Sequence, residues 1–311
     1  MAEPTTTVAG RPRGAPPAAS PPAPPRTDLA LLTLGVLCAS TTPPLIAATA
    51  APALAVAFWR TALGALAILP YVLTRARHEL RRASGRVIAL GVLGGAMLAA
   101  HFGTFMPSLG LTSVASAAAL VSSQTVWAGI FSALLGERLP ARAWLGTGVA
   151  LGGVLLVTGV DVSLSAEALR GDLLALLAGV FGGAYIVTGG AARRHLSTGA
   201  YTTICYGACA ALLLVVCVLS GQALAGYPAA DWARIAAITV LGQLLGHSIF
   251  NLVLRSVSPT LVSIAVLFTV PLSAILAAIA LGQTPPLAAL PAVALLLAGV
   301  GLVISARRAP A

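Results

Sequence analysis

The sequence contains very little charge and no lysine. Only 8% of its 311 residues are charged and 58% are hydrophobic, far from the roughly 25% charged and 45–50% apolar balance of soluble domains. This composition excludes a water-soluble enzyme. A membrane-spanning helix takes about 20 residues, so the apolar residues and 32 glycines fill about nine to ten spans and leave no room for an ordinary soluble domain. The sequence therefore predicts an all-α polytopic membrane protein.

Acidic residues are scarce. All eight fall in the N-terminal arm, in loops or at the ends of predicted helices, so no carboxylate is expected deep in the membrane. This placement argues against a proton relay built from buried Asp or Glu. The eighteen basic residues are all arginine, which we attribute to codon bias. Because they are scattered between apolar runs without interleaved aromatics, no nucleic-acid partner is expected.

The sequence offers no pattern for a metal or a cofactor. Its four cysteines, Cys38, Cys205, Cys209 and Cys217, lie in apolar segments, where no disulfide framework is expected. With no His or carboxylate near them in sequence, they act as small apolar residues. No Walker sequence is present, which argues against an ATP-driven pump within this chain.

The chain divides into a polar arm and ten apolar stretches. Residues 1–27 carry eight prolines and three arginines, so we expect a disordered cytoplasmic arm. Helices are expected at 29–48, 53–73, 87–107, 113–135 and 143–160 in the first half, and at 172–190, 199–219, 235–254, 260–281 and 287–305 in the second.

The two halves resemble each other in sequence. Asp28-Leu29 matches Asp172-Leu173 at an offset of 144, and Leu135-Gly136 matches Leu281-Gly282 at an offset of 146. The alternative is chance agreement between Leu/Gly/Val-rich helices. We favour a duplication, with five-helix repeats at 28–160 and 172–306.

The arginines predict the orientation, because positive charge collects on the cytoplasmic side. With a cytoplasmic N-terminus, fifteen arginines fall on the cytoplasmic side and two, Arg170 and Arg234, on the outer side. The fifteen are Arg11, Arg13, Arg26, Arg75, Arg77, Arg81, Arg82, Arg86, Arg138, Arg142, Arg193, Arg194, Arg255, Arg307 and Arg308. Both termini are thus expected in the cytoplasm. Since each repeat has five helices, the second must be inverted, as is common in secondary transporters.

Several short motifs carry a resemblance to a known family. They are Gly136-Glu137-Arg138-Leu139-Pro140, Gly171 to Gly179, Trp59-Arg60, and Gly246-His247-Ser248-Ile249-Phe250-Asn251 followed by Leu254-Arg255 and Ser258. In these motifs, and over nearly its whole length after residue 28, the chain resembles the drug/metabolite transporter superfamily, and within it proteins with two EamA-type repeats.

The resemblance implies a ten-helix transporter in the cytoplasmic membrane of a bacterium, often an exporter of metabolites, amino acids or drugs. One position departs from the family pattern. Gly282-Gln283 stands where the family usually repeats Gly-Glu at the end of the ninth helix. With that carboxylate missing, we infer no symmetric role for glutamate in the two repeats.

Polar residues in the eighth predicted helix are spaced four apart: Gln243, His247, Asn251 and Arg255. On a helix that turns 100° per residue, they drift only about 40° per step and form one polar stripe. The stripe either lines a substrate cavity or ties helices together by hydrogen bonds. We place Gln243 and His247 in the cavity, with His247 as a hydrogen-bonding group or proton carrier. Asn251 would be an orienting amide there, although structural roles suit it and Arg255 better.

Three further polar candidates lie inside apolar stretches. His101 is about 14 residues into the third helix. Arg60 is about seven residues into the second, roughly 10 Å below the outer surface at 1.5 Å per residue. Arg60 either attracts an anionic group or extends outward along its stem. Thr42, next to Thr41, is a candidate polar contact, although such hydroxyls commonly bond their own backbone.

Aromatic residues and prolines complete the candidates. The aromatics that could line a pocket, or serve as core or lipid contacts, are Trp59, Phe102, Phe105, Trp127 and Tyr185. Pro43-Pro44 and Pro271 remove backbone donors within predicted spans. Broken helices are where transporters place sites and hinges.

Taken with the resemblance, these features predict a secondary transporter of the inner membrane that exports a small metabolite, amino acid or drug by alternating access. Its expected partners are a small-molecule substrate and the lipid bilayer; coupled protons and a homodimer stay open. The alternatives are a lipid flippase of the same fold, or a membrane-embedded enzyme acting on a lipid-linked substrate. The enzyme is disfavoured because the 75–86 loop offers little beyond arginines, His78, Glu79 and Ser84.

Overall fold

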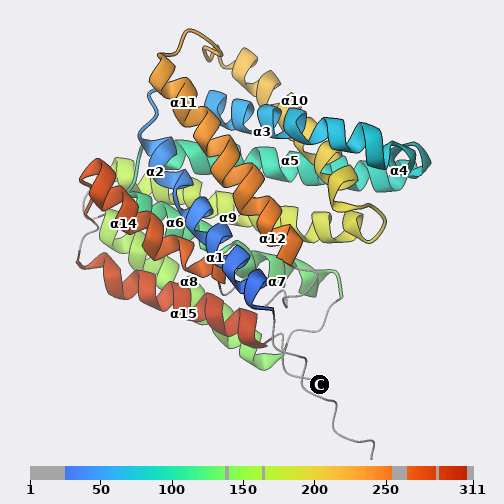
Figure 1. Cartoon of the computed structure of the whole chain (residues 1–311). Coiled ribbons are helices and arrows are strands. Elements are labelled where there is room, and N and C mark those ends of the chain that lie inside the picture. Colours follow the sequence, from blue (N-terminus) through green and yellow to red (C-terminus); the bar gives the residue numbers. More distant parts are fainter. Residues whose placement is uncertain (1–24, 137–139, 163–164, 254–264, 285–286, 307–311) are drawn as a thin grey trace, which may run out of the picture.

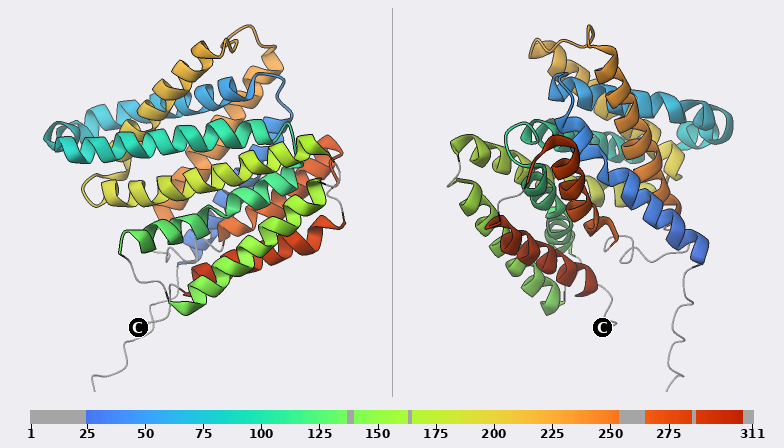
Figure 2. Two further views of the ribbon diagram at one scale, coloured as in Figure 1. Left: turned by 180° about the vertical axis from the view of Figure 1, so that it is seen from behind. Right: turned by 60° about the vertical axis from the view of Figure 1, so that its left-hand side comes forward.

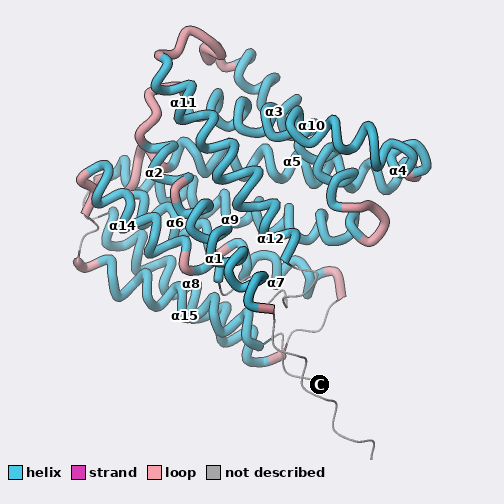
Figure 3. The backbone as a smooth tube through the Cα atoms, in the orientation of Figure 1, coloured by secondary structure: helices cyan, strands magenta, loops and turns pink. Residues whose placement is uncertain are grey.

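The computed structural model describes residues 25–136, 140–162, 165–253, 265–284 and 287–306, with the side chains at 157–162, 247–248, 251, 304 and 306 outside the description. Most of the predicted disordered arm and Arg255 therefore lie outside the described residues. The described residues form helices and loops without strands (Figure 3). The helices are α1 (Arg26–Ser40), α2 (Thr42–Ala47), α3 (Ala53–Tyr71), η1 (Val72–Ala76), α4 (Arg77–Arg82), α5 (Gly85–Ser108), α6 (Val114–Ser122), α7 (Gln124–Leu134), α8 (Ala141–Val162), α9 (Ala166–Arg193), α10 (Thr198–Leu219), α11 (Ala229–Ala237), η2 (Ile238–His247), α12 (Ser248–Val253), α14 (Thr269–Leu281) and α15 (Ala289–Ala306).

These helices follow the predicted apolar stretches, although α9 and α11 each begin six residues before the predicted starts at 172 and 235. Among the described residues, six helical segments are long and apolar enough to cross a membrane, and three shorter apolar helices accompany them. Serine caps explain several helix starts. The hydroxyls of Ser84, Ser113, Ser165 and Ser197 each accept a hydrogen bond from the backbone N–H three residues further on. The chain is an all-α polytopic membrane protein, as predicted.

Some predicted spans are interrupted. The first breaks at Thr41, between α1 and α2, directly before Pro43-Pro44. The fourth breaks at Ser123, between α6 and α7. The prediction of a regular α-helix over 235–254 is wrong, because Ile238–His247 is a π-helix between α11 and α12. A π-helix closes its hydrogen bonds over five residues, so a stripe calculated at 100° per residue does not hold there.

Two helix pairs lie at opposite edges of the bundle (Figures 1 and 2). At one edge α3 packs against α10, and at the other α8 packs along α15. Between these edges, α5 packs on α9 and α1 on η2. Glycines allow the close α8–α15 contact. A Cβ at Gly299 would lie 2.2 Å from the Ala150 backbone nitrogen, and one at Gly153 would lie 2.4 Å from that of Leu296.

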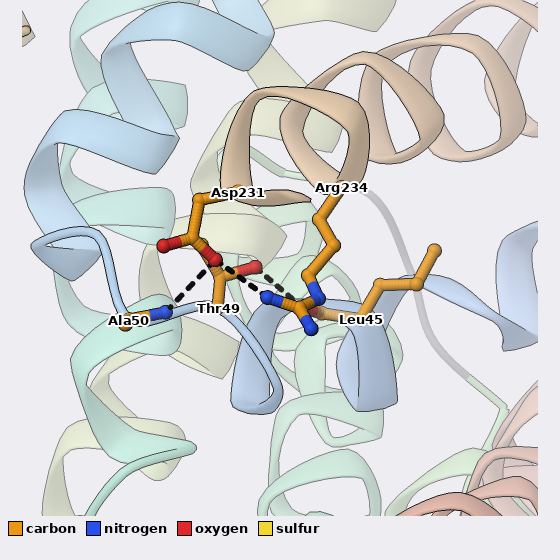
Figure 4. A network of polar contacts seen from close by, with 5 residues as sticks. All are labelled: Leu45, Thr49, Ala50, Asp231 and Arg234. Carbon is orange, nitrogen blue, oxygen red and sulfur yellow. Dashed lines mark hydrogen bonds and ion pairs between the residues drawn. The ribbon is translucent and has the colours of Figure 1, made fainter. Parts of the chain in front are cut away.

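One polar network joins the two halves at the predicted outer side (Figure 4). The carboxylate of Asp231, in the first turn of α11, accepts a hydrogen bond from Arg234 at 2.6 Å. It also accepts one from the backbone N–H of Ala50, in the loop between α2 and α3, at 3.3 Å. Asp231 is 2% exposed, so the loop after α2 is fixed to the start of α11 by a buried carboxylate.

Other contacts link loops that the arginine count assigns to one side. At the predicted outer side, the backbone N–H of Val114 donates to the Gln283 side chain at 3.3 Å. At the predicted cytoplasmic side, the carboxylate of Glu79 accepts a hydrogen bond from the backbone N–H of Ser197. In each case the loops joined are separated by an even number of predicted spans. This pairing fits a chain that crosses the membrane ten times.

Candidate functional site

A cavity of about 160 Å³ lies between helices from both halves of the chain. The first half contributes α1, α2, α3, α5, α6 and α7, and the second contributes η2, α12 and α14 with the residues just before it. The lining residues are Ala39, Thr42, Pro43, Arg60, His101, Phe102, Phe105, Ala118, Val121, Gln124, Gly242, Phe250, Val266, Thr269 and Ser273. Three predicted site residues, Thr42, Arg60 and His101, thus meet in one place.

Arg60 is the central charged group of this cavity. It lies two turns into α3 and is 3% exposed. Its Nε donates a hydrogen bond to Oε1 of Gln243 in η2 at 2.9 Å, and its guanidinium lies 4.5 Å from the centre of the Phe102 ring. Cation–π contact and the amide fix the head group toward the interior. The Arg60 side chain therefore does not extend outward along its stem, which was one of the two alternatives left by the sequence.

Thr42 and Arg60 both lie against η2 at Gly242, which has no side chain to keep them away. A Cβ at Gly242 would lie 2.4 Å from the Thr42 Oγ1 and 3.4 Å from the Arg60 Nη2. Unlike the Thr41 hydroxyl, which bonds its own backbone at Cys38, the buried Thr42 hydroxyl has no hydrogen-bond partner among the described residues. A donor with no protein acceptor thus stands next to the guanidinium.

His101 faces the cavity from α5 with a defined tautomer. Its Nδ1 lies 2.8 Å from the backbone oxygen of Ala178 in α9, and its ring stacks on that of Phe105 at a centroid distance of 6.0 Å. The carbonyl can only accept, so Nδ1 carries the proton and Nε2 of a neutral ring is an acceptor. Gln124, the first residue of α7, lies close by: a Cβ at Gly182 would touch both the Gln124 Oε1 and the His101 Nδ1.

The other predicted residues of the polar stripe have different outcomes. Gln243 lies behind Arg60 rather than on the cavity wall; it is 1% exposed and also lies near the Tyr206 phenol. Gln243 is not among the residues that line the cavity; it holds Arg60, which does, and a direct contact of Gln243 with substrate stays a prediction. The side chains of His247 and Asn251 lie outside the described residues, so their roles stay predictions.

The predicted aromatic residues divide between the cavity and other sites. Phe102 and Phe105 are on the wall. The Trp59 indole instead donates to the backbone oxygen of Leu224 at 2.8 Å, in the loop before α11. Trp127 packs near Phe131 and against Gly183 of α9, and Tyr185 packs at the margin of the main hydrophobic core. Tyr185 is thus a packing residue, whereas the buried Trp127 indole N–H has no hydrogen-bond partner among the described residues, and a pocket role for Trp127 stays a prediction.

Three polar wall residues, Gln124, Thr269 and Ser273, were not predicted from the sequence. Gln124 follows the helix break at Ser123, and a lone amide inside an apolar stretch was the available signal. Ser273 of α14 donates its hydroxyl to the backbone oxygen of Ser40 at 2.9 Å, next to the break between α1 and α2. No sequence signal identifies Ser273, because its partner lies 233 residues away.

Comparison with known proteins decides the family. The model of the EamA-like transporter family matches residues 27–159 and again 169–305, which together make up most of the chain. The chain belongs to the EamA-like transporter family. This EamA-like transporter is also similar in fold to a solved structure described only as "Crystal structure of protein", with a TM-score of 0.63 and 22% identity over 91% of this chain and 99% of the other. No curated protein matches the chain.

Family membership makes the chain a membrane transporter of the drug/metabolite type. In an EamA-like transporter, an interior cavity that holds a buried cation is a candidate binding site rather than a packing defect. Within the described part of the chain, no group of three His, Cys, Asp or Glu side chains is arranged to hold a metal ion. The chemistry of the site therefore rests on Arg60, Thr42, His101 and Gln124.

Proposed function

We propose that this EamA-like transporter is a secondary transporter that exports a small molecule by alternating access. The proposal rests on the cavity, which has a largely apolar wall with a few polar groups, holds the buried Arg60, and lies between helices of both halves. Relative movement of the halves would expose the cavity to one side and then the other. Export, the bacterial inner membrane and a small metabolite, amino acid or drug as cargo are what the family resemblance implies.

We further propose that the halves, 28–160 and 172–306, are inverted repeats. Helix packing supports this: the contact of α5 with α9 has its counterpart in the contact of η2 with α1, the third and sixth spans corresponding to the eighth and first. Gly136 and Gly282, at matching helix ends, both adopt positive φ, 96° and 67°. These are conformations that glycine reaches without strain.

Three contacts between the halves join loops that the arginine count assigns to the outer side, and we propose that they close that side. The Asp231 carboxylate holds the loop after α2, Trp59 bonds the loop before α11, and Gln283 bonds the start of α6. Gln283 replaces the family's glutamate with a neutral acceptor at a helix N-terminus. Opening toward the outside requires these contacts to separate.

Cysteine accessibility tests alternating access and orientation together. The four native cysteines, all buried, are first replaced. Ala118→Cys then places a thiol on the cavity wall, while Ser84→Cys and Ala225→Cys mark the loops before α5 and before α11. We expect an impermeant thiol reagent to modify Ser84→Cys only in inverted vesicles, Ala225→Cys only in intact cells, and Ala118→Cys in both.

Each contrary result is informative. Modification of Ala118→Cys from one side alone, or from neither, would show that the cavity does not alternate. Reversed labelling of Ser84→Cys and Ala225→Cys would show that the orientation assigned from the arginines is wrong.

A further inference from the structure

The charge of Arg60 has no counter-charge in the described protein. Among the residues that the structure describes, no carboxylate lies within ion-pair distance of Arg60. The acidic side chains that it places, such as Glu79, Asp172 and Asp231, belong to the bundle ends. The bond to Gln243 uses one of the five guanidinium N–H donors. The other donors have no protein acceptor among the described residues, and Arg60 faces the cavity.

Burying an isolated charge in a membrane protein is costly unless the charge is paired. Phe102 and the amide of Gln243 relieve part of this cost without neutralising the charge. The cavity is therefore electropositive at one wall. A negatively charged occupant supplies what the chain lacks, and a guanidinium fork fits the two oxygens of a planar carboxylate.

The remaining wall defines the rest of the ligand. The hydroxyl of Thr42, which has no partner among the described residues, and the Arg60 Nη2 both lie close to Gly242, so the two donors belong to the same part of the cavity wall. His101 and Gln124 also line the cavity and offer an acceptor nitrogen and an amide. The rings of Phe102 and Phe105 form apolar surface. At about 160 Å³ the cavity has room for roughly five waters at ~30 Å³ each, or for a small organic ion.

We propose that this cavity is a binding site for small organic monocarboxylates. The carboxylate pairs with Arg60 and accepts a hydrogen bond from Thr42, a polar group of the ligand meets His101 or Gln124, and its body lies against Phe102. A monoanion is favoured over a phosphate dianion because Arg60 is the sole cationic side chain on the described wall. That such ligands are the cargo rests on the proposed transport function.

Ligand binding to the purified full-length protein tests the site independently of transport. The thermal midpoint is measured with acetate, L-lactate and benzoate, with their amides, and with chloride at equal concentration. A ligand that binds the folded state raises the midpoint in proportion to ln(1 + [L]/Kd). We expect a carboxylate to raise it, with its amide and chloride giving little or no shift.

Variants locate the effect. Arg60→Gln should weaken carboxylate binding roughly 10- to 100-fold, as expected for a lost charge-assisted hydrogen bond. Thr42→Val, which keeps the side-chain shape, should weaken it about tenfold or less. Arg86→Gln is the matched control, because Arg86 is exposed in the first turn of α5. It should bind like the wild type.

Several results would overturn the proposal: no shift with any carboxylate, an equal shift with the amide, an equal shift with chloride, or a carboxylate shift unchanged in both Arg60→Gln and Thr42→Val. The two proposals fail separately. If a carboxylate binds in an Arg60-dependent way but is not transported, the site stands and carboxylates are not the cargo. If the protein transports an uncharged molecule but no carboxylate raises the thermal midpoint, transport stands and the anion site is wrong.

Discussion

At the scale of single residues, the absence of a side chain at Gly182 leaves room for two polar residues of the cavity wall, His101 and Gln124. Gly182 lies on α9 where α5 and α7 both approach, and a Cβ there would be 2.5 Å from the Gln124 Oε1 and 3.0 Å from the His101 Nδ1. Such contacts are too short for a carbon atom, so both side chains would have to move. The bond of His101 to Ala178, on the same helix, would be strained with them.

We therefore expect Gly182→Ala to impair carboxylate binding and transport by about tenfold, the cost of roughly one hydrogen bond. The control is Gly190→Ala, two turns along the same helix, where a Cβ would meet no atom within 4 Å. It should leave activity unchanged and stabilise the helix by roughly 0.5–1 kcal/mol. Thermal midpoints and uptake rates of the two variants check this. Equal activity of both would show that the His101–Gln124 pair has no role in the site.

Arg60 shows what could and could not be predicted about the site. A lone arginine inside an apolar stretch is visible in the sequence, and its burial agrees with that position. Its direction was not visible, because the Gln243 that fixes it lies 183 residues along the chain. Gln243 was identified as a site residue, but on the assumption of a regular helix. Contacts between distant segments depend on how the helices pack, and the periodicity of a single helix cannot predict them.

At the scale of helices, glycine determines how closely α8 and α15 approach. A Cβ added at Gly299, Gly146 or Gly153 would lie within 2.7 Å of backbone atoms of the facing helix. Backbone cannot yield as a flexible side chain does. In lipid, where apolar exposure drives no association, such close packing holds helices together.

We expect Gly299→Leu to separate these helices and to destabilise the protein by about 1–3 kcal/mol, the usual cost of overpacking. Gly301→Leu, two residues away, is its control, since a Cβ at Gly301 meets no atom within 4 Å. The thermal midpoint in detergent should fall for Gly299→Leu and stay near the wild-type value for Gly301→Leu. Midpoints that fall equally would contradict the close-contact account.

Helix extents were predictable where local signals exist. The lengths of the apolar stretches predicted α5 and α10 to within two residues, and Pro43-Pro44 indicated the break at Thr41. The break at Ser123 and the π-helix η2 were not predicted. No proline marks either one, and both adjoin the cavity, where neighbouring helices rather than local propensity set the backbone path.

At the scale of the whole molecule, the bundle places its polar groups in two kinds of location. Asp231, Arg234 and Glu79 hold loops at its ends, and Arg60 stands inside. Large apolar side chains such as Leu155 (74% exposed) and Ile279 (78% exposed) cover the outside, as lipid requires. The arginine count predicted the alternation of the loops, and the contacts between loops agree with it. The arginine count could not predict that both halves line one cavity, because that arrangement depends on how the helices pack.

Flux through this cavity is the central claim, and counterflow in proteoliposomes tests it most directly. Vesicles are loaded with the unlabelled monocarboxylate that binds best, and uptake of the radiolabelled compound is followed without ATP. We expect transient accumulation by the wild type and by Arg86→Gln, and a loss of at least about tenfold in Arg60→Gln. Accumulation by Arg60→Gln at the wild-type rate, or none by the wild type, would contradict it.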